Sequence, residues 1–391
     1  MENISQGKLG YKFTEEFGYI PDDWALMKLE SLGNFYKGAG ISKDDIKDSG
    51  IPCIRYAEIY TLYNFVVKKC YSYIDQELTS TSVPIKYGDI LLAGSGETKE
   101  EIGKCIACLI NKAYAGGDNI IFRPYTETIN SIYASYTLNT ICRTQLNKLG
   151  QGDAIVHIHS DNLKEVLIPV PPLPEQEKIA EVLGDIDSLI DTTQKLINKK
   201  EDIKTATMQK LLTPKEDWVE KKLGEITPDI YQPQTISQSV LSSDGYPVYG
   251  ANGIIGYYSK YNHITPQITV TCRGSTCGTI NLTLPYSWIT GNAMVINIDK
   301  VDFNKSFLYY LLSYADLSSL ITGSGQPQII RTSISEFKLF CPCNTKEQEK
   351  IAAILSDMDA EIETLEKELN KYKDLKIGMM QQLLTGKVRM I

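Results

Sequence analysis

The chain has 391 residues, of which 42% are hydrophobic and 23% charged, and its formal net charge is −8. This length predicts two or more domains, because single hydrophobic cores rarely grow to such a size. No apolar run reaches the roughly 18 residues of a membrane helix, so no membrane partner is expected. The acidic balance also argues against a protein that binds nucleic acid by its own charge alone.

The first residues, MENISQGKLGYKFTEEF, lack the basic and apolar segments of a signal peptide. Nine cysteines form an odd and scattered set along the chain. Because disulfides belong mainly to exported proteins, we expect these cysteines to be reduced thiols and the location to be cytoplasmic.

Residues 1–170 form the first predicted domain. Strand-like runs such as DILLAG, CIACLIN and NIIFRP alternate with turn residues, which predicts a mixed α/β unit rich in sheet and loops. Its basic residues are either solvated surface charges or contacts to nucleic-acid phosphates. The candidate contacts are Lys37, Arg55, Lys68, Lys69, Lys99 and Lys104.

Two motifs in this domain suggest chemistry that the surrounding residues do not support. Cys105-x-x-Cys108 has the spacing of zinc ligands, but the segment alternates small and apolar residues as a core strand does. DILLAGSGETKEE has the glycines of a phosphate loop, but Glu97 stands where phosphate would bind and no Gly-Lys-Ser/Thr follows. We therefore predict neither a metal site nor a nucleotide site.

Residues 171–213 and 343–391 are predicted to form two long helices, because one helical pattern occurs twice. Glu175–Thr213 and Glu347–Thr385 align without a gap and are identical at more than half of their positions. Apolar residues recur at alternating steps of three and four, as in helices that pack on a partner. These seam residues are Ile179, Leu183, Ile186, Ile190, Ile197 and Leu211 in the first copy, and Ile351, Leu355, Met358, Ile362, Leu365, Leu369 and Leu383 in the second.

Two matched helices in one chain are expected to pack on each other in antiparallel fashion, each with a globular unit at one end. A simple dimerisation coil is the alternative. Polar residues interrupt the seam at Thr193, Lys200 and Lys204 in the first copy and at Lys376 in the second. The prolines of PVPPLP prevent the first helix from starting before Glu175, because each proline removes a backbone donor.

Residues 214–342 form the second predicted domain, and it opens like the first. The segments IPDDWALMKLESL and PKEDWVEKKLGEI place Trp24 and Trp218 at equivalent positions. Beyond this opening the two domains diverge in sequence, which suggests two different binding faces on a repeated scaffold.

The second domain contains a long stretch with almost no charge. From residue 231 to 298 the only charged residues are Asp244, Lys260 and Arg273, among many tyrosines, asparagines and glycines. Each loop alone is more typical of an ordinary polar surface, but together they predict a surface that contacts phosphates and base edges. The candidates are Tyr249, Asn252, Tyr257, Tyr258, Lys260, Arg273, Ser275, Thr276, Gln326, Gln328 and Arg331.

With these features in place, the chain resembles the specificity subunit of type I restriction-modification systems. The resemblance rests on Trp24 and Trp218, on LIPVPPLPEQEKIAEVLGDID, and on EQEKIAAILSDMDAEIETLEKELNKYKDLKIGMMQQLLTGKV. YPVYGANGIIGYYSKYN and TGSGQPQI resemble the target-recognition segments of that family. The resemblance implies a mixed α/β fold with two target-recognition domains joined by two long antiparallel coiled-coil helices, related by a pseudo-two-fold axis.

The same resemblance implies a non-catalytic function and a set of partners. One domain would read each half of a split, asymmetric sequence in double-stranded DNA, and the helices would set the spacer. Two methyltransferase subunits would supply S-adenosylmethionine chemistry, and restriction and translocase subunits would use ATP and Mg²⁺. No cofactor is expected in this chain. The polar seam residues Thr193, Lys200 and Lys204 could then face a partner subunit in place of the second helix.

Two other function classes compete with this interpretation. A solitary adenine methyltransferase needs a D/N-P-P-Y/F motif, but the single Pro-Pro pair, Pro171-Pro172, stands between Val170 and Leu173. A coiled-coil scaffold whose two modules bind protein or sugar would have the same helices without a DNA surface. Binding to DNA by the assembled complex distinguishes a specificity subunit from such a scaffold: weak association that does not depend on salt would favour the scaffold.

Overall fold

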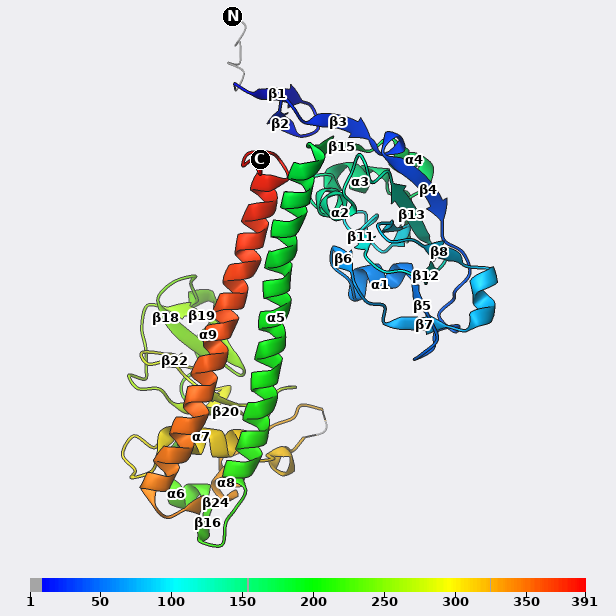
Figure 1. Ribbon diagram of the computed structural model, residues 1–391. Helices are drawn as coiled ribbons and strands as arrows, with labels where there is room; N and C mark the ends of the chain where they lie inside the picture. Colours follow the sequence, from blue (N-terminus) through cyan, green and yellow to red (C-terminus); the bar gives the residue numbers. More distant parts are fainter. Residues whose placement is uncertain (1–8, 153–154, 324) are drawn as a thin grey trace, which may run out of the picture. The chain divides into compact units, whose positions relative to one another are not determined.

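The computed structural model describes residues 9–152, 155–323 and 325–391, which form a mixed α/β structure (Figure 1). The chain falls into two compact units. Unit 1 comprises the residues up to Thr192 together with Leu369–Ile391, and unit 2 comprises Thr193–Glu368. Each unit therefore combines one globular part with halves of two long helices, α5 (Leu173–Leu212) and α9 (Thr345–Leu383). Both helices begin and end within a few residues of the positions that the repeat predicts.

Unit 1 is built on two sheets. The first has strand order β4-β13-β9-β11-β6, and the second has order β7-β5-β12-β8. Their strands are β4 (Gly33–Lys37), β13 (Asn119–Pro124), β9 (Ile90–Ala93), β11 (Cys105–Cys108), β6 (Val66–Val67), β7 (Ser72–Ile74), β5 (Ile51–Ile54), β12 (Ala113–Ala115) and β8 (Val83–Ile85). The predicted strand runs DILLAG, CIACLIN and NIIFRP become β9, β11 and β13.

Three short strand pairs and several helices complete unit 1. The pairs are β1 (Tyr11–Thr14) with β2 (Gly18–Pro21), β3 (Ala25–Lys28) with β15 (Leu167–Val170), and β10 (Ser95–Gly96) with β14 (Val156–His157). The helices are α1 (Tyr56–Thr61), α2 (Ser131–Asn139), α3 (Arg143–Leu149) and α4 (Ser160–Lys164), with 3₁₀ turns η1 (Leu29–Ser31) and η2 (Gln76–Ser80).

The central strands of unit 1 are apolar on both faces because each face meets a different core. On β9, Ile90 and Leu92 belong to the core that also holds Trp24, whereas Leu91 and Ala93 belong to a second core. Side chains alternate between the two faces of a strand, so a strand covered on both faces reads as a continuous apolar run. Cys105 and Cys108 lie on β11 in the same way, buried in opposite cores. The structure therefore places the C-x-x-C motif in core packing.

Unit 2 also holds two sheets, ordered β17-β23-β20-β21 and β19-β18-β22, and one strand pair, β16 with β24. The strands are β17 (Ile230–Tyr231), β23 (Ala293–Ile296), β20 (Ile268–Thr271), β21 (Ile280–Leu282), β19 (Gly253–Tyr258), β18 (Tyr246–Gly250), β22 (Trp288–Ile289), β16 (Trp218–Lys222) and β24 (Lys338–Pro342). The helices are α6 (Leu223–Ile226), α7 (Lys305–Tyr314) and α8 (Arg331–Ser335), with 3₁₀ turns η3 (Gln238–Val240) and η4 (Ser318–Leu320).

The two long helices pack in antiparallel fashion within each unit (α5 green and α9 orange to red in Figure 1). In unit 1 the start of α5, with Ile179 and Leu183, shares a core with Leu383 and Leu384 at the end of α9. In unit 2 the start of α9, with Ile351 and Leu355, shares a core with Leu212 at the end of α5. Opposite ends of the helices therefore meet in both units.

Most predicted seam residues are buried, and the others are half-buried. The buried ones are Ile179, Leu183, Ile186, Ile197, Ile351, Leu355, Ile362, Leu369 and Leu383. Ile190, Leu211, Met358 and Leu365 are half-buried. At the end of α5 the buried side chain is Leu212, one position beyond the predicted Leu211; Leu212 belongs to the core that holds Trp218, and Leu211 packs against that core.

The polar residues of the seam contact the other helix of the same chain. Lys376 pairs with Asp187, and Lys204 pairs with Asp359. Lys200 Nζ lies 2.6 Å from a carboxylate oxygen of Glu361. Thr193 is buried as well. The suggestion that these α5 positions face a partner subunit is therefore wrong for the lysines, which are already ion-paired across the seam.

A frame of equivalent contacts holds each globular part to the start of a long helix. In unit 1 the Trp24 indole donates to Glu175 at 3.1 Å, and in unit 2 the Trp218 indole donates to Glu347 at 3.5 Å. The side chains of Gln176 and Gln348, one residue further on, accept hydrogen bonds from the backbone amides of Asn130 and Asn304, at 2.8 and 2.9 Å. These four helix residues lie at equivalent positions of the repeat.

The frame continues into a tyrosine–aspartate–lysine group in each unit. The Tyr136 hydroxyl donates to Asp187, which also pairs with Lys376. The Tyr310 hydroxyl donates to Asp359 at 2.6 Å, and Asp359 also pairs with Lys204. Each lysine ammonium also lies over the ring of its tyrosine, at 5.5 and 5.7 Å. The aspartate of one helix copy thus meets the lysine of the other copy in both units.

Candidate nucleic-acid interface

Three loops of unit 2 that the sequence singles out meet at one place. The first is the turn of the β18–β19 hairpin, Ala251-Asn252. The Thr271 hydroxyl at the end of β20 donates to the carbonyl of Ala251, which ties this turn to the next loop. Arg273 is the second residue after β20, so this hydrogen bond brings the loop of Arg273 to the turn that carries Asn252.

The third loop joins through backbone hydrogen bonds. Arg273 and Gln328 form an isolated β-bridge, and the amide of Gly274 donates to the carbonyl of Pro327 at 3.0 Å. The amide of Ile329 donates to the carbonyl of Cys272 at 3.1 Å. Residue 324, within the predicted TGSGQPQI segment, lies outside the described residues. The fold therefore gathers three recognition candidates, one from each loop.

The polar side chains of these loops face solvent and are free to bind. Asn252, Arg273 and Gln326 are exposed, and within the described part of the chain their side chains make no hydrogen bond or ion pair. Ser275 and Gln328 are exposed too, whereas Thr276 is half-buried. An arginine without a carboxylate partner can bind guanine or phosphate, and an asparagine can pair with adenine.

The other candidates of unit 2 differ in exposure, and two of the tyrosines are not free at the surface. Tyr249 is buried, and its hydroxyl accepts a hydrogen bond from the amide of Leu284 at 3.0 Å, so it offers no surface to a ligand. Burial raises the pKa of this phenol. Tyr258 is half-buried and packs edge-on against Trp288. Arg331 is exposed in α8, where it donates to the carbonyl of Pro228 at 3.3 Å. Tyr257 and Lys260 are exposed.

A cluster of three exposed tyrosines lies at the other end of the β18–β19 hairpin. The rings of Tyr246 and Tyr261 meet edge-on at 4.9 Å, and those of Tyr261 and Tyr286 at 5.3 Å. Tyr286 has a positive φ of 52°, which is rare for a bulky residue and costs energy that the fold must supply elsewhere. Tyr246 and Tyr261 belong to the segment YPVYGANGIIGYYSKYN, but none of the three was among the candidate contacts; the density of tyrosine in this segment was the available signal.

The basic candidates of unit 1 are spread over several elements. Lys37 ends β4 and is exposed, as are Lys68, Lys69 and Lys99. Arg55 lies 3.4 Å from the carboxylate of Glu58 and helps to cap α1. Lys104 donates weakly to the carbonyl of Tyr60 at 3.3 Å, and its partial burial lowers the pKa of its ammonium group. Arg55 is therefore engaged, and no single loop cluster gathers these residues.

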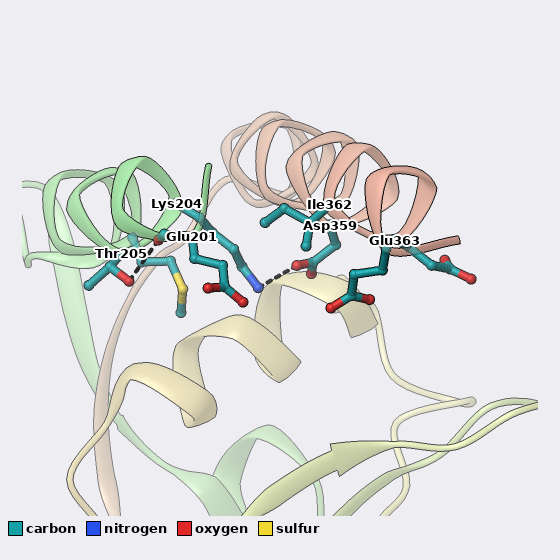
Figure 2. Close-up of a pocket in the computed structure, with 8 residues that line it drawn as sticks. Glu201, Lys204, Thr205, Asp359, Ile362 and Glu363 are labelled. Atoms are coloured by element: carbon teal, nitrogen blue, oxygen red, sulfur yellow. Dashed lines mark hydrogen bonds and ion pairs between the residues drawn. The ribbon is translucent and has the colours of Figure 1, made fainter. Parts of the chain in front are cut away.

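Unit 2 also has a cavity of about 420 Å³ between α5 and α9 (Figure 2). Figure 2 shows the Lys204 ammonium pointing to Asp359 across it. The carboxylates that line it are Glu201, Asp359, Glu363 and Glu366, against the single cation Lys204. This excess of negative charge repels phosphate, so the cavity does not belong to a DNA surface.

The family model for the type I restriction modification DNA specificity domain matches this chain twice, over residues 21–201 and 215–373. The two matches cover most of the sequence. The chain belongs to this family. Each match spans most of one globular part and most of the long helix that follows it, as the internal repeat suggests.

Two type I specificity subunits of one organism are similar over nearly the whole chain. The MjaVIII specificity subunit of Methanocaldococcus jannaschii is 24% identical, with 95% of this chain and 94% of the relative covered. The putative MjaX specificity subunit of the same organism is 26% identical, with 96% of each covered. These two relatives match this chain over nearly their full lengths.

Solved structures support the fold. The S subunit of a type I restriction-modification system from M. genitalium matches with a TM-score of 0.68 at 19% identity, covering 95% of this chain and 97% of that one. A chain from a structural study of assembly and conformational transition in the type I system matches with a TM-score of 0.51 at 15% identity, covering 94% and 99%. The predicted fold class is confirmed.

As a type I specificity subunit, the chain belongs to the target-recognition part of its system and is not a catalytic subunit. DNA and methyltransferase subunits are the partners that this role implies. Among the described residues, no helix has the length and apolarity to cross a membrane. The described part also holds no group of three or more His, Cys, Asp or Glu residues arranged to bind a metal.

Proposed function

We propose that this specificity subunit reads a split, asymmetric sequence in double-stranded DNA, with one unit for each half-site. The observation that carries the proposal is the meeting of three loops in unit 2, where Asn252, Arg273 and Gln326 present free polar side chains. Phosphate contacts would come from Lys260 and the exposed tyrosines in unit 2, and from the exposed lysines of unit 1.

The chain would work with partner subunits in the cytoplasm. Two methyltransferase subunits would dock, because the contacts between each globular part and the long helices occur in two equivalent copies. They would contribute S-adenosylmethionine and much of the positive charge that a chain of net charge −8 lacks for DNA. Restriction and translocase subunits would add ATP and Mg²⁺, and this chain itself would hold no cofactor.

Adenine methylation mapping by long-read sequencing tests the proposal. Cells would express the methyltransferase subunit with or without this chain. We expect a new motif of two short defined halves around a fixed gap, present only with the chain. If no new motif appears although both subunits are shown to be present and assembled, the proposal is contradicted, and a scaffold that does not read DNA is favoured.

A further inference from the structure

The tip of the β18–β19 hairpin carries two adjacent exposed isoleucines. Ile254 is 46% exposed and Ile255 is 51% exposed. Ile254 pairs with Tyr249 and Gly256 pairs with Val248, so Ile255 is the extra residue of a β-bulge, and both isoleucines are left exposed beside the turn. The two adjacent side chains form a small apolar surface at the tip, next to the polar side chain of Asn252.

The backbone holds this tip in place. The side chain of Ile255 lies over Gly250, and a Cβ on Gly250 would stand 2.6 Å from its Cγ2 atom. Gly253 has a φ of +91°, a conformation that favours glycine at the end of this tight turn. The hydrogen bond from Thr271 to the carbonyl of Ala251 anchors the turn to β20. The turn next to the two isoleucines is thus tied to β20.

The residues around the tip suit the edge of a base pair. Asn252 lies in the turn between the strands, and asparagine can bind adenine through two hydrogen bonds. The partner of adenine is thymine, whose C5-methyl group is an apolar feature of the major groove, and a two-stranded β-ribbon can enter that groove. Asp244 is the only acidic residue from 231 to 298, so little negative charge opposes the phosphates.

We propose that the hairpin tip enters the major groove and that Ile254 and Ile255 contact the C5-methyl groups of thymine beside an adenine bound by Asn252. This inference rests on the proposed function, and it adds that unit 2 reads A·T pairs. The isoleucines determine specificity through apolar contact: the affinity is higher for a base that carries a methyl group, and the isoleucines make no hydrogen bond to the base.

Replacement of thymine by uracil tests the contact, because uracil pairs like thymine but lacks the methyl group. The assembled complex of the full chain with its methyltransferase subunits would be titrated with duplexes that carry the mapped motif. Each thymine of the two half-sites would be replaced in turn. We expect a three- to tenfold weaker affinity at one or two positions of a single half-site, since a buried methyl group is worth about 0.8 kcal/mol, or roughly fourfold.

The same duplexes would then be tested with the chain that carries Ile254→Ala and Ile255→Ala. We expect weaker binding to the thymine duplex and no further loss with uracil. Ile264→Ala is the matched control, because Ile264 is 59% exposed in the same unit but outside the hairpin. Gly250→Ala is a second variant that displaces Ile255 without removing it, and it should reduce the cost of uracil as well.

Several outcomes would overturn the inference. They are an affinity that no uracil changes, a cost of uracil that persists in the double variant, and a motif without thymine in the half-site that unit 2 reads. Equal loss on thymine and uracil duplexes, or loss of the methyltransferase subunits from the complex, would assign the tip to another partner. If no split motif is found at all, the proposed function fails first, and the two failures are distinguishable.

Discussion

The two units share one frame and differ on their surfaces and in the strength of their ion pairs. In unit 1, Glu175 is buried and receives hydrogen bonds from Arg389 at 2.8 and 2.9 Å and from Trp24. In unit 2, the equivalent Glu347 is half-buried and pairs with Lys215 at 2.6 Å. Arg389 also binds Asp23 through two hydrogen bonds. The same helix start is therefore held more tightly in unit 1.

The two units repeat their internal contacts and differ in their exposed polar residues. The repeated contacts join each globular part to the helices, and they use buried tryptophan, glutamine and tyrosine side chains. The recognition candidates lie elsewhere, on exposed loops in unit 2 and on dispersed lysines in unit 1. A frame of buried polar contacts tolerates little change, because an unpaired buried group costs stability, whereas an exposed loop can change freely.

Removal of seven residues from the middle of both long helices should have the largest effect. Loss of a heptad preserves the seam pattern but shortens each helix by about 10 Å, which corresponds to roughly three base pairs of DNA. We expect both half-sites to keep their bases while the gap between them changes, or the complex to fail to assemble. Methylation mapping measures the motif, and an unchanged gap would contradict a role for the helices in setting the spacer.

Replacement of Asn252 and Arg273 by alanine should affect one half-site only. Each base contact is worth about 1–3 kcal/mol, so we expect roughly a hundredfold loss of affinity for DNA that contains the half-site of unit 2. Duplexes altered in the other half-site should show the same relative affinities as before. A uniform loss over all sequences, with a reduced salt dependence, would instead identify these residues as phosphate contacts.

Replacement of Lys376 by methionine should destabilise unit 1 by about 3 kcal/mol, because Asp187 would remain in the seam without its cation. The matched change in unit 2, Lys204→Met, should cost only about 1 kcal/mol. The side chain of Lys204 is 24% exposed and that of Lys376 is 11% exposed, so water compensates Asp359 more readily. Urea unfolding measures both, and equal losses would show that burial does not distinguish the two pairs.

Replacement of Arg389 by alanine should cost about 2 kcal/mol at neutral pH, and Lys215→Ala in unit 2 should cost less than about 1 kcal/mol because that pair is more exposed. Burial raises the pKa of the Glu175 carboxyl, but hydrogen bonds from Arg389, Met390 and Trp24 outweigh it and bring the pKa below its ordinary value of 4.5.

A lowered pKa in the folded chain means that protonation of Glu175 favours unfolding. The stability that this carboxylate contributes is present above pH 4.5 and is lost as the pH falls below it. The difference in unfolding free energy between the wild type and Arg389→Ala should therefore shrink on acidification. Urea titrations at neutral and acidic pH measure it, and a difference that is constant with pH would exclude the carboxylate as the partner that matters.

The sequence predicted the helices and their seam well, because a heptad repeat is a local pattern with a long signal. It placed Leu211 on the seam, where Leu211 is half-buried and the next residue, Leu212, is buried in the core of unit 2. It also missed the frame residues Asn130 and Asn304. Their role depends on contacts with the buried side chains of Gln176 and Gln348, which lie more than forty residues away in the chain.

The exposure of the candidate recognition residues was predicted only in part. Exposed residues such as Asn252 and Arg273 were identified from composition, but composition also selected Tyr249, which the fold buries. Tyr249 lies in β18, where its side chain packs in a small core with Ile289, Ala293 and Val295. These partners lie forty or more residues further along the chain, so no local residue pattern indicated that Tyr249 is buried.

The sequence by itself determined the repeated helices, the two divergent globular parts and the family, because periodicity and repeated motifs are properties of the chain alone. The tertiary structure decided which polar seam residues pair with each other, which tyrosines are buried, and which loops meet around Asn252 and Arg273. These depend on hydrogen bonds and packing between residues far apart in the chain, and only the fold brings such residues together.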